Sequence, residues 1–252
     1  MTRCFLCWAG RRCREGSPNS NTLEQFLGES VPVVCASETG LPIPAGAEIA
    51  VEGWLVPDNN RIEGPFGEWT GYYADSPRPA PNLLISRLYH RDNPILLGAP
   101  PGKPPHDYSY MRTALKSAMI EDQLVGLGVG GIRSAWAHEA GGGRLFVVVS
   151  IKQQYAGHSR QVGQLTAHLP TAAYMNRYVV VVDDDIDVTN LGEVIWAMST
   201  RSDPATDIEI NRRTWGSKLD PMLKPDHPPF NSRAVIDACI PFERRTDFHV
   251  WR

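Results

Sequence analysis

Apolar and polar residues alternate in several short stretches of the first hundred residues, a pattern typical of β-strands. In the stretch AEIAVEGWL, the alternation places Ile49, Val51 and Leu55 on one face. NLLISRLYH and PILLG also predict strands, and the turn RDNP precedes the second of them. Short strands separated by Pro and Gly favour a β-barrel or sandwich over residues 30–105.

The pattern changes period after this region. In SYMRTALKSAMIEDQLVGLG, the apolar residues Met111, Leu115, Ala118 and Met119 recur at helical spacing. GRLFVVVSIK and NRYVVVVDDDID then predict strands, and HSRQVGQLTAHL and NLGEVIWAMSTR predict helices, the second with Asn190 as its N-cap. Alternating strands and helices predict an α/β domain with helices packed on a sheet.

These patterns divide the chain into parts, with a boundary near Tyr108. Residues 1–22 are expected to form a disordered arm, which ends in the polar run EGSPNSN. Residues 23–108 form the predicted β domain, and residues 109–252 form a connecting helix and the α/β domain. The Pro-rich tail from Thr214 onward is expected to be irregular and to wrap over a surface.

Composition and charge exclude several classes of protein. The 252 residues carry a formal net charge of -3, which gives no general attraction to nucleic acid. No apolar run approaches the roughly 20 residues of a membrane span, and no signal-peptide core is recognisable. Five cysteines predict a reduced, cytoplasmic protein. Cys4, Cys7 and Cys13 lack a second well-spaced pair, so no metal site is predicted there.

The stretch IEGPFGEWTGYY contains the strongest candidate chemistry. Glu63 and Glu68 flank a turn in which Pro65 fixes one backbone angle while Gly64 and Gly67 permit tight conformations. Two carboxylates held close together do not both ionise readily, so one can keep its proton and act as an acid. The alternative is a solvated surface turn, and the three aromatic residues that follow count against it.

A run of carboxylates, DDDID, follows the second predicted buried strand. Carboxylates at the end of a strand can bind Mg²⁺ or Ca²⁺. Asp187 and Asn190 are equally suited to accept hydrogen bonds from the free N–H groups of the next helix. We favour this capping role over a metal site.

Several long blocks resemble one known family. EGPFGEWTGYY resembles the signature of the UbiD-like decarboxylases, carboxy-lyases that depend on prenylated flavin mononucleotide (FMN). The resemblance extends to VPVVCASETGLPIPAGAEIAVEGWL before it, and to YVVVVDDDIDVTNLGEVIWAMSTRSDP and SRAVIDACIPFE after it. These blocks follow the family's order and spacing across residues 24–243.

This resemblance implies a fold and a reaction. The fold is part of a split β-barrel that binds flavin, followed by a C-terminal α/β domain that builds a homo-oligomer. The reaction is the non-oxidative, reversible decarboxylation of an aromatic or α,β-unsaturated carboxylic acid. In it, Glu68 stands at the position of the proton donor, and Glu63 at the position that pairs with a catalytic arginine. The implied cofactors are prenylated FMN with Mn²⁺ and K⁺.

The chain departs from the family in one respect. The family's arginine, its Asn and His manganese ligands and most phosphate contacts lie in an N-terminal half, and a glutamate ligand would fall near Asn19. The chain therefore resembles the C-terminal half of such an enzyme, from either a truncated gene or a split one, and in the second case the implied partner is a separate N-terminal half. We expect the chain alone to retain no flavin. The alternative is a non-catalytic fragment or assembly subunit of such a decarboxylase.

Overall fold

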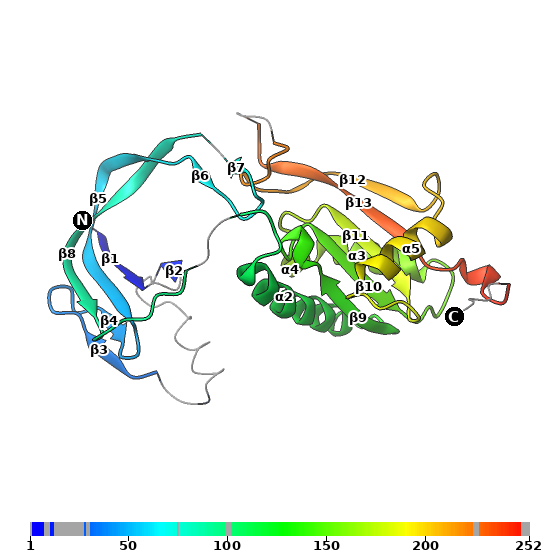
Figure 1. Ribbon diagram of the computed structural model, residues 1–252, viewed down its shortest axis with the longest axis horizontal. Coiled ribbons are helices and arrows are strands. Elements are labelled where there is room, and N and C mark those ends of the chain that lie inside the picture. The colour runs from blue at the N-terminus through cyan, green and yellow to red at the C-terminus, as the bar shows by residue number, and fades with distance from the viewer. Residues whose placement is uncertain are drawn as a thin grey trace. The chain divides into compact units, whose positions relative to one another are not determined.

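The computed structural model describes residues 2–7, 11–12, 28, 31–74, 76–98, 102–223 and 227–247 (Figure 1). The chain forms two compact units. Unit 1 comprises Met1–Gly64 and Ser76–Gly98, and unit 2 comprises Pro65–Asp75 and Ala99–Arg252. The turn that carries Glu68 therefore belongs to unit 2, although strands of unit 1 flank it in the sequence.

Unit 1 consists of strands. They are β1 (Thr2–Cys7), β2 (Arg11–Arg12), β3 (Val33–Cys35), β4 (Pro42–Pro44), β5 (Ile49–Glu63) and β8 (Arg78–His90). An antiparallel sheet has the order β2-β1-β5-β8, and β3 pairs with β4 in a separate hairpin. The predicted strands around Val51 and Leu84 are confirmed as β5 and β8. The described strands form no closed sheet, so the split β-barrel stays a proposal.

The two faces of β5 differ in burial at the start of the strand. Ala50 and Glu52 are the buried positions at the start of the strand, whereas Ile49 and Val51 are only half-buried. The reason is a hydrogen-bond network, because the fully buried Glu52 carboxylate accepts from the backbone N–H of Thr39 (2.6 Å) and from other donors described below. A polar residue therefore occupies a core position that periodicity assigns to apolar side chains.

Three further donors complete the shell of Glu52. The Glu38 N–H (3.0 Å), the Thr39 hydroxyl (2.8 Å) and the Tyr89 hydroxyl (2.6 Å) all donate to its carboxylate. Burial raises the pKa of this carboxyl, but the hydrogen bonds outweigh burial and lower the pKa to about 2. The carboxylate thus ties the loop before β4 to β5 and β8.

The strand predicted for PILLG is also wrong. This segment pairs with no strand in the described part of the chain, and Ile95 is 78% exposed. Its backbone N–H donates instead to the Glu48 carboxylate (3.1 Å), which fixes the segment as a loop. The apolar run is therefore an exposed loop and not a strand.

The expectation of a disordered arm over residues 1–22 needs correction as well. Thr2–Cys7 forms β1, which pairs with β5 along the edge opposite β8. Since the backbone N–H and C=O groups of β5 need partners on both sides, this pairing satisfies them. Residues 8–10 and 13–22 lie outside the described residues.

Unit 2 contains a five-stranded sheet with helices on both faces (Figure 1). Its elements are β6 (Phe66–Gly67), β7 (Tyr73–Ala74), α2 (Asp107–Gly126), β9 (Ile132–Ala137), η1 (Glu139–Gly141), β10 (Phe146–Ile151), α3 (His158–His168), α4 (Pro170–Ala173), β11 (Tyr178–Asp183), α5 (Leu191–Arg201), β12 (Ile208–Trp215), β13 (Phe230–Ala238) and η2 (Phe242–Arg244). The sheet order is β12-β13-β11-β10-β9, with β10, β11 and β13 parallel and both edge strands antiparallel. The predicted α/β alternation is confirmed.

The valine runs explain why β10 and β11 lie in the middle of this sheet. Val147 and Val149 of β10 pack with residues of α2 and α3 on one face. Val148 packs with Val194 of α5 on the other face. A strand covered on both faces has a continuous apolar sequence, which is the pattern of VVVS and VVVV.

The predicted helix is confirmed as α2, but the apolar residues that indicated it lie on its exposed side. Met111, Leu115 and Met119 are exposed, at 59%, 63% and 43%. The buried face instead carries Thr113 and Ser117, which are hydrogen-bonded to the backbone of β9 through Ala137 (2.7 and 3.0 Å). The hydroxyl groups satisfy the backbone of β9 along the first half of the helix. Farther along, Ile120 and Leu124 of the same face join the apolar core.

The tail was expected to be irregular from Thr214 onward, and this is wrong for Phe230–Ala238. That segment is β13, which lies between β11 and β12 and pairs with β11 in parallel. Its alternating pattern is interrupted by Arg233, which is 2% exposed and donates to the backbone carbonyls of Ala167 and Ala173. Because a charged residue stands at a buried position of this strand, the sequence does not show the apolar pattern that predicts a strand.

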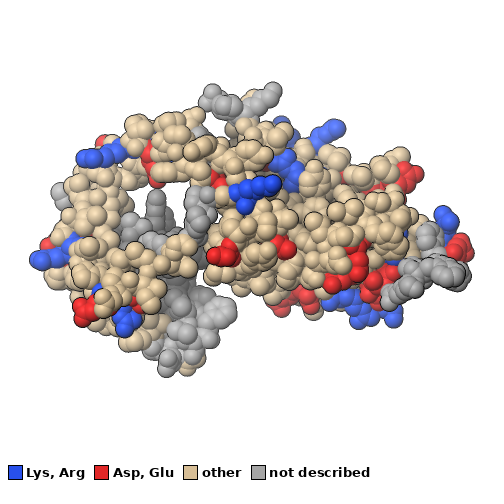
Figure 2. Space-filling model, viewed as in Figure 1, with Lys and Arg blue, Asp and Glu red and all other residues tan. Residues whose placement is uncertain are grey.

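No helix in the part of the chain that the structure describes is long and apolar enough to cross a bilayer. On the face shown in Figure 2, basic and acidic side chains are interspersed over unit 2. This distribution matches the small net charge of the chain. The distribution of charged side chains on this face therefore does not by itself indicate a functional site.

Candidate functional site around Glu68

Glu68 lies on a short hairpin in unit 2. β6 pairs with β7, and between them the Glu68 N–H donates to the Tyr72 carbonyl (2.9 Å), while the Glu68 carbonyl accepts from the Gly71 N–H (2.9 Å). Gly71 has a φ of 85°, and a Cβ there would lie 2.8 Å from Cα of Lys103. Only glycine fits this position, so the backbone around Glu68 has one well-defined conformation.

The next residue, Trp69, anchors the hairpin. Its side chain is 7% exposed and lies against the loop after η1. A Cβ added to Gly142, whose φ is 65°, would lie 2.4 Å from Cζ3 of Trp69. The Trp69 ring therefore occupies a space that is open only because residue 142 has no side chain, and we call this space the Trp69 seat.

Arg112 and Arg144 lie beside the Trp69 ring, and we refer to them, together with the nearby Lys116, as the cationic cluster. The guanidinium carbons of Arg112 and Arg144 lie 5.5 and 5.3 Å from the centroid of the Trp69 ring. Arg112 also lies 4.1 Å from the ring centroid of Tyr108, and Arg144 lies 5.2 Å from that of Tyr174. These are cation–π distances.

The electrostatics of the cationic cluster are unusual. Burial and the neighbouring charges of Arg144 and Arg112 lower the pKa of Lys116 to about 8. Burial and the charge of Arg112 also lower the pKa of Arg144. Within the described residues, none of the three cations forms an ion pair with a carboxylate. The cluster thus concentrates positive charge that this part of the chain does not neutralise.

The two predicted site residues occupy different units. Glu63 is the last residue of β5 in unit 1, is exposed, and stands opposite Arg78 of β8 in the sheet register. Glu68 belongs to unit 2 and is half-buried. Gly64 between them has a φ of 83°, the left-handed conformation expected for this glycine. The convergence of the two carboxylates in one site stays a prediction.

The carboxylate run after β11 has the structural role predicted for it. Asp187 accepts from the Thr189 N–H (2.9 Å), and Asn190 caps α5 by accepting from the N–H groups of its first turn. Asp183 and Asp185 both accept hydrogen bonds from the buried Arg201. In the described residues, no group of three or more His, Cys, Asp or Glu side chains is arranged to hold a metal ion.

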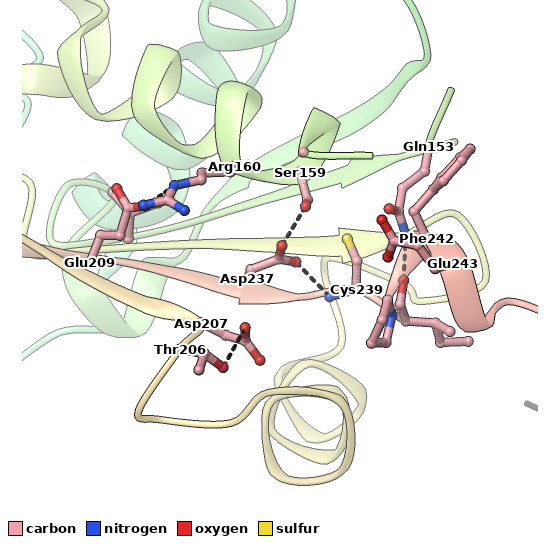
Figure 3. A pocket seen from close by; sticks show the side chains of 14 residues that line it. Gln153, Ser159, Arg160, Thr206, Asp207, Glu209, Asp237, Cys239, Phe242 and Glu243 are labelled. Atoms are coloured by element: carbon pink, nitrogen blue, oxygen red, sulfur yellow. Dashed lines mark hydrogen bonds and ion pairs between the residues drawn. The ribbon is translucent and has the colours of Figure 1, made fainter. Parts of the chain in front are cut away.

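A second candidate is a cavity of about 240 Å³ at the end of the sheet (Figure 3). Figure 3 shows Asp237 between Ser159, which donates to it, and the Cys239 N–H (3.0 Å). Burial raises the pKa of the Cys239 thiol well above its usual range, so the thiol is a poor nucleophile. Glu209 pairs with Arg160. Asp237 and Ser159 are thus paired with each other, as are Glu209 and Arg160, so we assign this cavity no chemistry.

Sequence reasoning missed the cationic cluster and the seat of Trp69. The available signal was the i, i+4 spacing of Arg112 and Lys116 on a predicted helix, next to the aromatic Tyr108. Arg144 lies far away in the sequence, in a glycine-rich loop that has no periodic pattern. Only the packing of that loop against α2 brings the three cations together.

Two family models match the chain. A model described as the 3-octaprenyl-4-hydroxybenzoate carboxy-lyase Rift-related domain matches residues 6–104. A model described as the C-terminal domain of the same carboxy-lyase matches residues 109–238. A phenolic acid decarboxylase of Bacillus subtilis (strain 168) is 32% identical over 222 residues, or 88% of this chain and 46% of that protein. The chain thus spans about half the length of this relative.

Solved structures of similar proteins share the fold. The UbiD-class enzyme HmfF from Pelotomaculum thermopropionicum, in complex with FMN, superposes with a TM-score of 0.79 at 26% identity, covering 95% of this chain and 52% of that chain. An evolved dimeric form of HmfF with prFMN gives 0.70 at 25% identity, covering 91% and 47%. Vanillic acid decarboxylase of Sedimentibacter hydroxybenzoicus gives 0.75 at 31% identity, covering 85% and 45%.

Proposed function

The chain belongs to the UbiD family of carboxy-lyases, and we propose that it supplies the proton donor, Glu68, for a prenylated-FMN-dependent decarboxylation. The substrate is a small aromatic or α,β-unsaturated carboxylic acid, and the reaction is non-oxidative and reversible. Relatives named for aromatic acids, and neighbours solved with FMN and prFMN, support the substrate class and the flavin.

One observation carries the assignment of Glu68. Its backbone is fixed by two hydrogen bonds and by the buried Trp69, while its half-buried carboxyl has no hydrogen bond or ion pair to the described residues. A proton donor needs a fixed position and a carboxyl group that is not engaged elsewhere. Glu68 combines both properties, and a structural glutamate such as Glu52, with four donors, does not.

The hairpin also fits a bound polar group. The Trp69 indole nitrogen and the Thr70 hydroxyl are buried without a hydrogen-bond partner in the described residues. Both belong to the two residues that directly follow Glu68. When bound, prenylated FMN supplies the electron sink for the carbon that loses carbon dioxide. Glu68 holds the proton that this carbon receives, and Trp69 keeps Glu68 in place. For Mn²⁺ and K⁺, no ligand is assigned among the described residues.

Glu63 and the partners complete the proposal. Glu63 pairs with an arginine that a separate N-terminal half supplies, and the α/β part of unit 2 builds a homo-oligomer. The alternative function is a non-catalytic assembly subunit of such a decarboxylase. The two functions differ in whether an assembly that contains this chain and flavin turns over an aromatic acid.

Glu68→Gln tests the assignment. The amide keeps the shape of the side chain and removes the transferable proton, so decarboxylation should fall by about 100-fold or more. The chain is co-expressed with an N-terminal half and a flavin prenyltransferase, and turnover and flavin absorbance are measured. Asp122→Asn, an exposed carboxyl-to-amide change on α2, is the matched control and should keep full activity. Turnover of the Glu68 variant above about a tenth of wild type would refute its role.

A further inference from the structure

A larger cavity, of about 540 Å³, lies along β12, an edge strand of the sheet in unit 2 (Figure 1). Besides residues of β12, it is lined by Arg233 of β13, by Ala173 of α4 and by His168 at the end of α3. Its volume is typical of small-molecule sites. The lining includes Arg212, Arg213 and Arg233, and no Asp or Glu of the described residues belongs to it. The cavity therefore attracts anions.

Arg233 is a buried cation that no carboxylate neutralises in the described part of the chain. Its guanidinium donates to the backbone carbonyls of Ala167, Ala173 (2.7 Å) and Trp215 (3.4 Å). Its Nε–H is buried without a hydrogen-bond partner among the described residues, and burial lowers the pKa of Arg233 to about 10. Carbonyl oxygens carry only partial charges, so an anion in the cavity would offset positive charge that remains uncompensated.

A β-bulge in β12 presents the other two arginines. The register with β13 shifts between Asn211 and Thr214, and within this bulge Arg213 has a φ of 59°. A positive φ is uncommon for a residue with a side chain, and such positions cluster at functional sites. Arg212 and Arg213 are exposed, and the guanidinium carbon of Arg213 lies 4.7 Å from the centroid of the Phe230 ring. A guanidinium over the face of a ring keeps its N–H donors available for an acceptor.

The bulge also disfavours a strand of another chain as the occupant of this edge. Bulges and charged side chains interrupt the row of backbone groups that an added strand would pair with. Two consecutive arginines in the bulge therefore suit a small anion better than an extension of the sheet.

Trp215 adds a flat apolar surface to the same cavity. The residue is 60% exposed, although its ring centroid lies 5.2 Å from that of Tyr174. Its backbone carbonyl accepts from the Met175 N–H (3.4 Å) and from Arg233, which fixes its position. Aromatic bases stack on exposed aromatic side chains, and the two fused rings of an indole match the two fused rings of a purine. Positive charge beside a stacking surface is the complement of a phosphate joined to a base.

We propose that this cavity binds a purine mononucleotide, whose phosphate is held by Arg212 and Arg213 next to the charge of Arg233 and whose base stacks on Trp215. Arginine forks bind phosphate oxygens through paired, charge-assisted hydrogen bonds. No lining residue belongs to the Glu68 hairpin or to the cationic cluster, so the site does not depend on the proposed function.

Isothermal titration calorimetry with the full chain tests this inference without turnover. We expect adenosine monophosphate (AMP) to bind with a Kd below about 1 mM, and at least about tenfold more tightly than adenosine, ribose 5-phosphate or FMN. Adenosine lacks the phosphate and ribose 5-phosphate lacks the base, so each comparison isolates one half of the site. FMN tests whether the cavity instead recognises the flavin.

Substitutions at exposed positions assign the contacts. Arg212→Gln and Arg213→Gln should each weaken AMP binding by about tenfold, because each removes charge-assisted hydrogen bonds. Trp215→Leu should weaken it by about fivefold or more, since the stacking surface is lost. Arg133→Gln removes an exposed arginine from β9, the opposite edge strand, and is the matched control that should leave AMP binding unchanged. Circular dichroism checks the fold of each variant, and Arg212→Gln decides if Arg213→Gln fails to fold.

Several results would overturn the inference. One is a folded wild-type chain whose Kd for AMP exceeds about 1 mM. Another is a preference for AMP of less than about tenfold over adenosine, ribose 5-phosphate or FMN, because the phosphate, the base or the purine is then not recognised. Arginine variants that bind AMP as tightly as Arg133→Gln does would have the same consequence. Glu68→Gln should bind AMP as wild type does, so the nucleotide site and the proton donor are tested separately.

Discussion

Replacing Lys116 by methionine should stabilise the protein at pH 7. The difference between the ordinary pKa of 10.5 and the lowered value of about 8 corresponds to about 3 kcal/mol, at about 1.36 kcal/mol per pKa unit. Lys116 is half-buried, so water screens part of this penalty, and we expect a net gain of about 1–2 kcal/mol. Methionine keeps the length of the side chain and removes the repulsion by Arg112 and Arg144.

The pH dependence identifies the cause. Because the folded state releases the Lys116 proton at a lower pH than the unfolded state does, the unfolded state binds more protons between about pH 8 and 10.5. Wild-type stability should therefore rise over this window, and the advantage of Lys116→Met should be largest below pH 8 and fade toward pH 10.5.

Urea denaturation at several pH values measures this difference. Lys152→Met, a change at an exposed lysine of unit 2, is the control and should shift stability by less than about 0.5 kcal/mol. A Lys116→Met protein that is less stable than wild type at pH 7, or whose advantage does not change with pH, would refute the reasoning.

Two further substitutions probe the hydrogen bonds and the packing. Gly142→Ala should destabilise by about 1–3 kcal/mol, because the residue has a positive φ and its Cβ would meet Trp69; thermal unfolding measures this. Gly128→Ala, also at a positive φ but in open space, should cost less, and equal losses would contradict the role of the Trp69 seat. Glu52→Gln should destabilise by about 1.5–3 kcal/mol at pH 7 in urea denaturation. The pKa of Glu52 in the folded protein is about 2, so the stability that its carboxylate contributes is lost as the pH falls from about 4.5 to 2. The stabilities of Glu52→Gln and wild type should therefore converge over this pH range, and a constant difference between them would contradict the reasoning.

The sequence predicted elements well where one physical requirement determined the pattern. The valine runs of β10 and β11 are continuous because both faces of these strands are buried, and their positions were predicted correctly. α5 begins where Asn190 can cap it, and that position was also correct. Errors arose where two requirements competed. On α2, the hydroxyl groups of Thr113 and Ser117 satisfy the backbone of β9 and share the buried face with Ile120 and Leu124, whereas Met111 and Leu115 are exposed.

The sequence by itself determined the α/β order of the C-terminal part, the family resemblance and the rigid turn that carries Glu68, because these depend on residues close together in the chain. Only the tertiary structure assigned Glu63 and Glu68 to different units and surrounded Trp69 with cations. Arg112 and Arg144 are 32 positions apart in the sequence, and no local pattern relates them. The two arginines lie close together because the loop after η1 packs against α2. This packing depends on the absence of a side chain at residue 142, since the Trp69 ring occupies the space that a side chain there would fill.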